Sequence, residues 1–281
     1  MKTANLTSVA IAALLGIVML AGAGCTNSKT NQETSDNMET LNLTQEWDKK
    51  FPQSDKVNHR KVTFKNRYGI ILAADLYEPK NVEDKLAAIA VSGPFGAVKE
   101  QASGLYAQTM AERGFLTLAF DPSYTGESGG EPRNVASPDI NTEDFSAAVD
   151  FLTALPDVDA ERIGIIGICG FGGMGLNAAA MDTRIKATVA STMYDMSRVN
   201  ANGYFDTENS ADDRNKKREM MNVIRTRDAQ SGTITPGVPG LPDSITGEEP
   251  QFVKDYFDYY KTNRGFHVRS INSNGAWSPT M

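Results

Sequence analysis

Residues 164–173 read GIIGICGFGG, in which an apolar strand pattern over residues 162–168 runs into a cysteine that is followed by glycines. A helix of small residues is expected after this turn, over Met174–Met181. A cysteine at a helix N-terminus gains from the helix dipole, which favours a thiolate and lowers its pKa. The flanking glycines would let a substrate carbonyl approach the backbone closely. We therefore interpret Cys169 as a nucleophile, against the alternative of a buried, inert thiol.

Strand and helix patterns alternate on both sides of Cys169, which predicts an α/β sheet. Strand patterns cover residues 57–66, 70–77, 85–91, 115–120, 162–168 and 184–191, and helix patterns cover residues 101–113, 174–181, 211–228, 251–261 and a segment that Asn141 caps. The first two strands favour an antiparallel hairpin, because only a short turn separates them. The strand–helix units between residues 85 and 191 favour right-handed crossovers and therefore parallel strands.

Two further loops follow strands of the predicted sheet. The sequence SGPFG at residues 92–96 follows the first parallel strand, and DPSYTGESGG at residues 121–130 follows the next one. The order and spacing of these loops and the cysteine turn resemble the α/β-hydrolase superfamily. The cysteine turn is similar to the nucleophile elbow of that superfamily, with Gly167 at its small position two residues before the nucleophile. Phe171 stands two residues after Cys169, where the superfamily usually has a small residue.

The resemblance covers roughly residues 57–200 and implies a mostly parallel sheet with helices on both faces. Residues 196–262 are expected to form an inserted helical cap. With a cysteine at the nucleophile position, the chain resembles the dienelactone-hydrolase-like branch of the superfamily. In that branch a Cys–His–Asp triad cleaves esters or lactones through a thioester intermediate. For this chain, the resemblance implies that the N–H groups of Gly170 and Phe95 stabilise the oxyanion. It also implies that Asp121 is structural and organises N–H groups of its loop.

The general base must follow the nucleophile in the chain order of this superfamily. Of the two histidines, His59 precedes Cys169, so His267 is the candidate base. The strand context expected around a catalytic histidine is missing near residue 267. We therefore expect the last strands of the sheet, with the acid and the histidine, to lie beyond residue 281, in which case this chain alone would have little activity. A divergent site that pairs His267 with Asp195, or a site with no base, remains the alternative.

The first 25 residues have the layout of a secretory signal, with Lys2, an apolar run over residues 9–20 and small residues before Cys25. The apolar run is too short to span a bilayer. This arrangement resembles a bacterial lipoprotein signal, which predicts lipidation of Cys25 and a membrane anchor in the cell envelope, on the periplasmic or surface side. Ordinary secretion is the alternative. Residues 26–55 are predicted to be a polar tether, and residues 56–281 the hydrolase domain.

Composition narrows the class of function. A net charge of −7 and a pI near 5.0 argue against nucleic-acid binding. With two cysteines and two histidines, neither a disulfide scaffold nor a multi-ligand zinc site is expected. The glycine register does not fit a dinucleotide loop, so no cofactor is expected. The predicted function is hydrolysis of ester, thioester or lactone bonds in a small acyl substrate. A peptidase of the same fold, a non-catalytic binding lipoprotein and a fragment without its own function are the alternatives.

Overall fold

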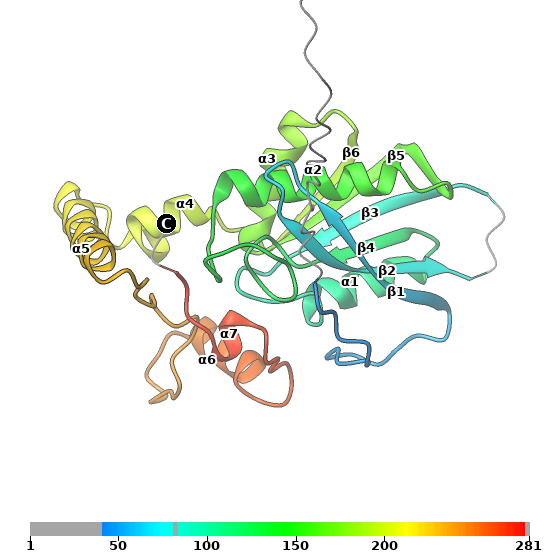
Figure 1. Ribbon diagram of the computed structural model, residues 1–281. Helices are drawn as coiled ribbons and strands as arrows, with labels where there is room; N and C mark the ends of the chain where they lie inside the picture. Colours follow the sequence, from blue (N-terminus) through cyan, green and yellow to red (C-terminus); the bar gives the residue numbers. More distant parts are fainter. Residues whose placement is uncertain (1–40, 81–83, 279–281) are drawn as a thin grey trace, which may run out of the picture. The chain divides into compact units, whose positions relative to one another are not determined.

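A six-stranded sheet forms the core of the protein, in the order β1-β2-β4-β3-β5-β6 (Figure 1). The computed structural model describes residues 41–80 and 84–278. The strands are β1 Val57–Lys65, β2 Ile71–Pro79, β3 Leu86–Ser92, β4 Leu116–Phe120, β5 Val158–Ile168 and β6 Ile185–Ser191. The strands β1 and β2 form an antiparallel hairpin, and β4, β3, β5 and β6 are parallel. Both arrangements confirm the predictions from the sequence.

Helices cover both faces of the sheet, because alternate strand residues present apolar side chains to opposite sides. On one face, α2 (Pro138–Thr153) and α3 (Gly170–Met181) pack over Leu118 and Ile165. On the other face, α1 (Ala102–Ala111) packs its alanines against a second apolar cluster that includes Val91 and Ile168. The fold is therefore that of an α/β protein whose parallel strands all end at one edge, beside Cys169.

The N-terminus of α2 differs from the prediction that Asn141 caps this helix. Ser137 is the N-cap, and its hydroxyl accepts a hydrogen bond from the N–H of Ile140. Asn141 lies in the first turn and its side chain accepts a hydrogen bond from the N–H of Ser137 at 3.0 Å. The Ser137 hydroxyl thus satisfies a backbone N–H of the first turn, and the Asn141 side chain satisfies the N–H of the N-cap residue, an arrangement that resembles a capping box. The prediction was wrong because the proline at the start of the helix fits its first turn.

The polar segment before β1 packs onto the domain, which corrects the predicted end of the tether at Asp55. Phe51 and Lys49 are both buried, and the indole N–H of Trp47 donates a hydrogen bond to the carbonyl of Phe51 at 2.9 Å. The side chain of Gln108 in α1 donates to the carbonyl of Pro52. Residues 41–55 thus belong to the folded part, whereas residues 1–40 lie outside the described residues.

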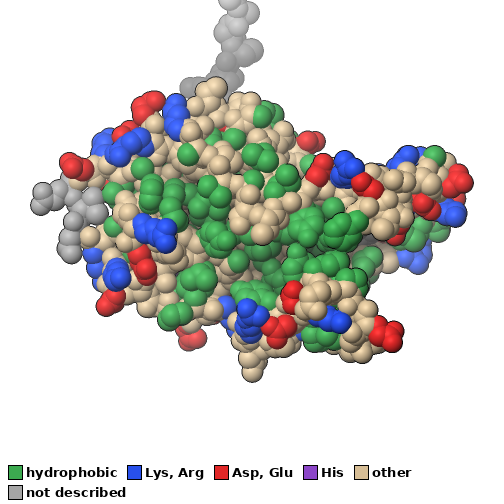
Figure 2. Space-filling model, turned by 180° about the vertical axis from the view of Figure 1, so that it is seen from behind, with side chains coloured by type: hydrophobic (Ala, Val, Ile, Leu, Met, Phe, Trp, Pro, Cys, Tyr) green, Lys and Arg blue, Asp and Glu red, His purple; other side chains and the backbone are tan. Residues whose placement is uncertain are grey.

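The chain after β6 is helical, as the sequence predicts. It contains α4 (Met196–Asn202), a 3-10 turn (Tyr204–Asp206), α5 (Ala211–Ser231), α6 (Gln251–Tyr260) and the short α7 (Ile271–Asn274). No residue of α5 is buried. Hydrophobic side chains gather across the middle of the face shown in Figure 2. Within residues 41–80 and 84–278, no helix has both the length and the apolar character needed to cross a bilayer.

Candidate active site

Cys169 occupies a sharp turn between the last residue of β5 and the first residue of α3. Its φ is 57° and its ψ is −124°, a conformation that a residue with a side chain rarely adopts. The turn is held by its own backbone: the N–H of Cys169 donates to the carbonyl of Ser191 at 2.9 Å, and its carbonyl accepts from Gly172 and Tyr194. The structure therefore contains the strand–turn–helix arrangement that the sequence predicts.

Two residues beside the cysteine explain how the turn is accommodated. A Cβ atom at Gly167 would lie 2.2 Å from the carbonyl oxygen of Phe171, so only glycine fits there. Phe171 departs from the small residue of the superfamily pattern, but its ring is buried and packs near Phe95 and Phe145. The ring extends the apolar core under the turn, so a large residue is tolerated at this position.

Two backbone donors face the thiol. The backbone N–H groups of Gly170 and Phe95 lie close enough to the sulfur of Cys169 to lower the pKa of its thiol through hydrogen bonding. Gly170 begins α3, and Phe95 lies in the loop that follows β3. These are the two groups that the sequence resemblance suggested for the oxyanion hole. The structure brings both of them to Cys169, where they could bind negative charge that develops on a substrate oxygen.

The pKa of the Cys169 thiol differs from the prediction for a helix N-terminus. Burial raises this pKa, and the hydrogen bonds from Gly170, Phe95 and the hydroxyl of Tyr256 offset only part of the rise. The expectation of a lowered pKa was wrong because the cost of removing a thiolate from water exceeds the gain from these donors. Burial therefore makes the thiolate of Cys169 less populated than that of an exposed cysteine at the same pH.

An aromatic cluster from the C-terminal half lies beside Cys169, and sequence analysis did not assign it to the site. Tyr256 of α6 contacts the thiol, and Tyr194 hydrogen-bonds to Tyr256. The rings of Tyr194 and Tyr204 meet edge to face at 5.8 Å, and Phe252 links Tyr204 to Tyr256. The sequence predicted a helix over residues 251–261, but no local pattern indicated that its aromatic side chains would reach the cysteine.

The histidines and Asp195 have other partners. Nε2 of His267 lies 3.5 Å from the carboxylate of Asp48, and its Nδ1 accepts the N–H of Arg269. His59 bonds to Asp75 at 2.8 Å. Asp195 caps α4 by accepting the N–H of Arg198. The structure does not pair the predicted base His267 with Cys169 or with Asp195, because the half-buried Asp48 of the N-terminal segment and the N–H of Arg269 hold its ring elsewhere.

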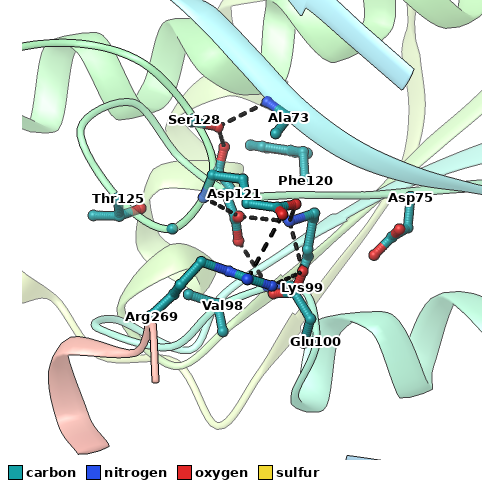
Figure 3. Close-up of polar contacts among 12 residues, drawn as sticks. Ala73, Asp75, Val98, Lys99, Glu100, Phe120, Asp121, Thr125, Ser128 and Arg269 are labelled. Carbon is teal, nitrogen blue, oxygen red and sulfur yellow. Dashed lines mark hydrogen bonds and ion pairs between the residues drawn. The ribbon is translucent and has the colours of Figure 1, made fainter. Parts of the chain in front are cut away.

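A buried ionic cluster supports the loops around the site (Figure 3). The ammonium group of Lys99 lies 2.7 Å from Glu100, 2.8 Å from Asp121 and 2.7 Å from Glu127. Burial alone would lower the pKa of Lys99, but the carboxylates around it raise that pKa well above its ordinary value. The three carboxylates could bind a cation together, and all three contact this ammonium group. Lys61 and Arg269 form further ion pairs with Glu100 and Glu127.

Asp121 has the structural role that the resemblance implied for it. Its carboxylate accepts the N–H of Lys99 at 2.8 Å and the N–H of Glu127 at 2.9 Å. The first of these bonds ties the loop after β3 to the loop after β4. Because Phe95 belongs to the loop after β3, the cluster limits the positions that its N–H can adopt beside Cys169.

The sheet, the cysteine turn and the two backbone donors together define a protein of the α/β-hydrolase superfamily. Residues 68–233 match the family described as X-Pro dipeptidyl-peptidase (S15 family). The chain belongs to this family. The match includes Cys169, Gly170 and Phe95 but neither the N-terminal 67 residues nor the C-terminal segment that contains α6 and α7.

Three proteins are similar to this chain in sequence or in structure. The protein named "Uncharacterized protein PA2218" from Pseudomonas aeruginosa is 60% identical over 272 residues, which are 95% of this chain and 72% of that protein. Its crystal structure has a TM-score of 0.82 at 64% identity and covers 86% of this chain and 74% of that chain. The structure of the alpha/beta hydrolase GrgF from Penicillium sp. sh18 has a TM-score of 0.59 at 21% identity, covers 79% and 74% of the two chains, and shows the shared fold. Thiohydrolase aneE from Aspergillus aculeatus is 35% identical over 103 residues, 37% of this chain and 32% of that protein.

Proposed function

We propose that this protein hydrolyses acyl thioesters through a covalent intermediate on Cys169. The observation that carries this proposal is the position of the sulfur, which faces the N–H groups of Phe95 and Gly170 from a strained turn. A nucleophile beside two fixed donors suits acyl transfer, because the same donors can hold the oxyanion of the tetrahedral intermediate. The similarity to a protein named thiohydrolase supports the same class of substrate.

The reaction proceeds in two acyl transfers. The thiol of Cys169 first loses its proton to solvent. The thiolate attacks the carbonyl carbon, and the electrons of the carbonyl move onto its oxygen, which the N–H groups of Phe95 and Gly170 stabilise. Collapse of this intermediate breaks the bond to the leaving thiolate, which takes up a proton from solvent. Water then attacks the acyl-cysteine and loses one proton to solvent. The bond between the acyl carbon and sulfur breaks, so that Cys169 departs as the thiolate and the acyl group leaves as a carboxylic acid.

The polar groups around the sulfur favour thioesters over oxygen esters and amides. The two N–H groups and the hydroxyl of Tyr256 all donate to Cys169, so they stabilise a thiolate but do not remove its proton. A thiolate leaves without prior protonation, since an ordinary thiol has a pKa of about 8.5. An amine or an alkoxide needs a proton donor before it can leave. The site is therefore best suited to a leaving group that is already a weak base.

A leaving-group series tests this proposal. We expect kcat/KM to fall by about 10-fold or more from an acyl thioester to an aryl ester of the same acyl group, and further to an alkyl ester or lactone. Intact-mass measurement should show one acyl group per chain. Cleavage of an X-Pro anilide with no reaction of the thioester would instead support a peptidase, which the family description favours. Neither turnover nor a mass increase would support the non-catalytic binding protein that the raised thiol pKa favours.

We also propose that Cys25 is lipidated and anchors the protein in the cell envelope. The support is the sequence of the first 25 residues, which lie outside the described residues. When bacteria that express the protein are grown with an alkyne fatty acid, the wild-type chain and the variant Cys169→Ser should both become labelled. The variant Cys25→Ser should carry no label. Labelling that persists in Cys25→Ser would contradict the anchor, because Cys169 is the other cysteine of the chain.

A further inference from the structure

The C-terminal segment, residues 264–278, contacts the loop that carries the Phe95 donor. The side-chain NH2 of Asn272 donates to the carbonyl of Phe95 at 2.8 Å. The backbone N–H of Asn272 donates to the carbonyl of Gly96 at 3.1 Å, and the hydroxyl of Ser270 donates to the same carbonyl at 2.9 Å. Two consecutive carbonyls of the loop are therefore held by one short stretch that lies far away in sequence.

The loop that carries Phe95 and the C-terminal segment are also closely packed against each other. Gly96 has a φ of 79°, and a Cβ atom there would lie 2.4 Å from the side-chain oxygen of Asn272. The ring of Phe95 stacks on Trp277, with centroids 4.2 Å apart and planes 22° apart. The backbone of Trp277 pairs in turn with Gly237 and Val238. Because the contacts involve both the ring and the carbonyl of Phe95, they leave that residue little rotational freedom.

We propose that Asn272 is a positioning residue that holds Phe95 so that its N–H points at the reacting sulfur and the oxyanion. This inference rests on the proposed function for its catalytic consequence. The ionic cluster fixes the loop from one side, where Asp121 accepts the N–H of Lys99. Asn272 fixes it from the other side. Without the Asn272 side chain, the loop between Gly93 and Val98 would lose the hydrogen bond to the carbonyl of Phe95. The N–H of Phe95 would then point at the sulfur of Cys169 for a smaller fraction of the time.

A measurement on the thiol alone tests this role without any substrate. In Asn272→Ala, the pH midpoint of Cys169 alkylation by iodoacetamide should rise by about one pH unit, because a thiolate loses one of its donors. The titratable groups that face the sulfur are the hydroxyls of Tyr204, Tyr256 and Tyr260, whose pKa values are all raised by burial. These groups stay protonated across the measured range. The alkylated cysteine is identified by peptide mass, which separates it from Cys25.

The catalytic readout is a split between kcat and KM. We expect Asn272→Ala to lower kcat for an acyl thioester by about 10- to 100-fold, with KM changed less than about 3-fold, because the donor acts mainly in the transition state. The matched control is Asn274→Ala, since Asn274 ends α7 and its side chain is exposed. This control should leave the alkylation midpoint and kcat at their wild-type values.

A second variant separates loss of the donor from loss of the fold. Asn272→Leu keeps the branched shape of the side chain and removes its NH2, so it should reproduce both effects if Asn272→Ala unfolds. A folded Asn272→Leu protein with the wild-type midpoint and kcat would overturn the positioning role. If the wild-type protein has no turnover at all, the proposed function fails, and the shift of the alkylation midpoint alone still decides the role of Asn272.

Discussion

Replacing Cys169 with alanine is expected to lower kcat/KM for an acyl thioester by roughly 10³-fold or more, about 4 kcal/mol of transition-state stabilisation. The alanine keeps a Cβ atom at the same left-handed backbone position, where φ is 57°. The N–H groups of Phe95 and Gly170 stay in place, so any residual rate measures the oxyanion donors without the nucleophile. The measurement is steady-state hydrolysis, with intact mass to show that the acyl-enzyme is lost.

Two further variants sharpen this expectation. Cys169→Ser should be nearly as inactive as the alanine variant, because the donors around the side chain do not remove a proton and a serine hydroxyl ionises far less readily than a thiol. Cys25→Ser, assayed in detergent, should keep the wild-type rate. A Cys169→Ala protein that retains its fold and most of the wild-type turnover would rule out the covalent route.

Replacing Lys99 with methionine is expected to lower the free energy of unfolding by about 3–5 kcal/mol. Lys99 is completely buried, and its ammonium group contacts the carboxylates of Glu100, Asp121 and Glu127. Methionine fills a similar volume but leaves three buried carboxylates without their shared cation, and they lie within 4.8 Å of one another. Denaturant unfolding measures the loss, and the loop that carries Phe95 should become accessible to proteases.

The matched control for this variant is Lys186→Met. Lys186 pairs with Glu161 at 3.5 Å on the surface, where both side chains are exposed, so we expect a change of about 1 kcal/mol or less. Equal effects of the two substitutions would mean that the buried cluster contributes no more than a surface ion pair.

The cluster should also make the protein sensitive to acid. Burial opposes ionisation of Glu127, but the charge of Lys99 and the hydrogen bonds from Lys61 and Lys99 lower its pKa to about 2. A carboxylate whose pKa is lowered on folding stabilises the fold above its unfolded-state pKa of about 4.3, and this contribution is lost as the pH falls towards 2. Wild-type stability should therefore fall in this window, and the fall should be smaller in Lys99→Met, whose Glu127 has a pKa nearer the ordinary value.

The regular elements were predictable because they depend on local pattern. The strand patterns over residues 85–91, 115–120 and 162–168 predicted β3, β4 and β5, and the helix pattern at Asn141 predicted α2. The strand β5 begins earlier than its apolar run, at Val158. The observed strand ends differ from the predicted ones by a few residues, and the N-cap of α2 is Ser137 where the sequence predicted Asn141. The parallel pairing of β3, β4, β5 and β6 followed from the preference for right-handed strand–helix connections, which does not depend on individual side chains.

The surroundings of the site were less predictable because they depend on contacts between distant residues. No sequence pattern assigned a role to Lys99, Glu100 or Glu127, yet the fold buries their side chains together. His267 was a candidate base by chain order alone, and the structure places it beside Asp48. The segment near residue 272 has no strand or helix pattern of useful length, so nothing local indicated that it would hold Phe95.

The sequence alone determined that Cys169 follows a buried strand and precedes a helix, and that Gly167 leaves room for this turn. Tertiary structure alone decided the direction in which the pKa of the Cys169 thiol is shifted and which residues surround the thiol. The physical reason is that a strand or a turn depends on residues next to it in the chain, whereas a pKa depends on how much water and how many charges the whole fold leaves around the group. At Cys169 burial outweighs the hydrogen bonds from Gly170, Phe95 and Tyr256, and Tyr256 reaches the sulfur from 87 residues further along the chain.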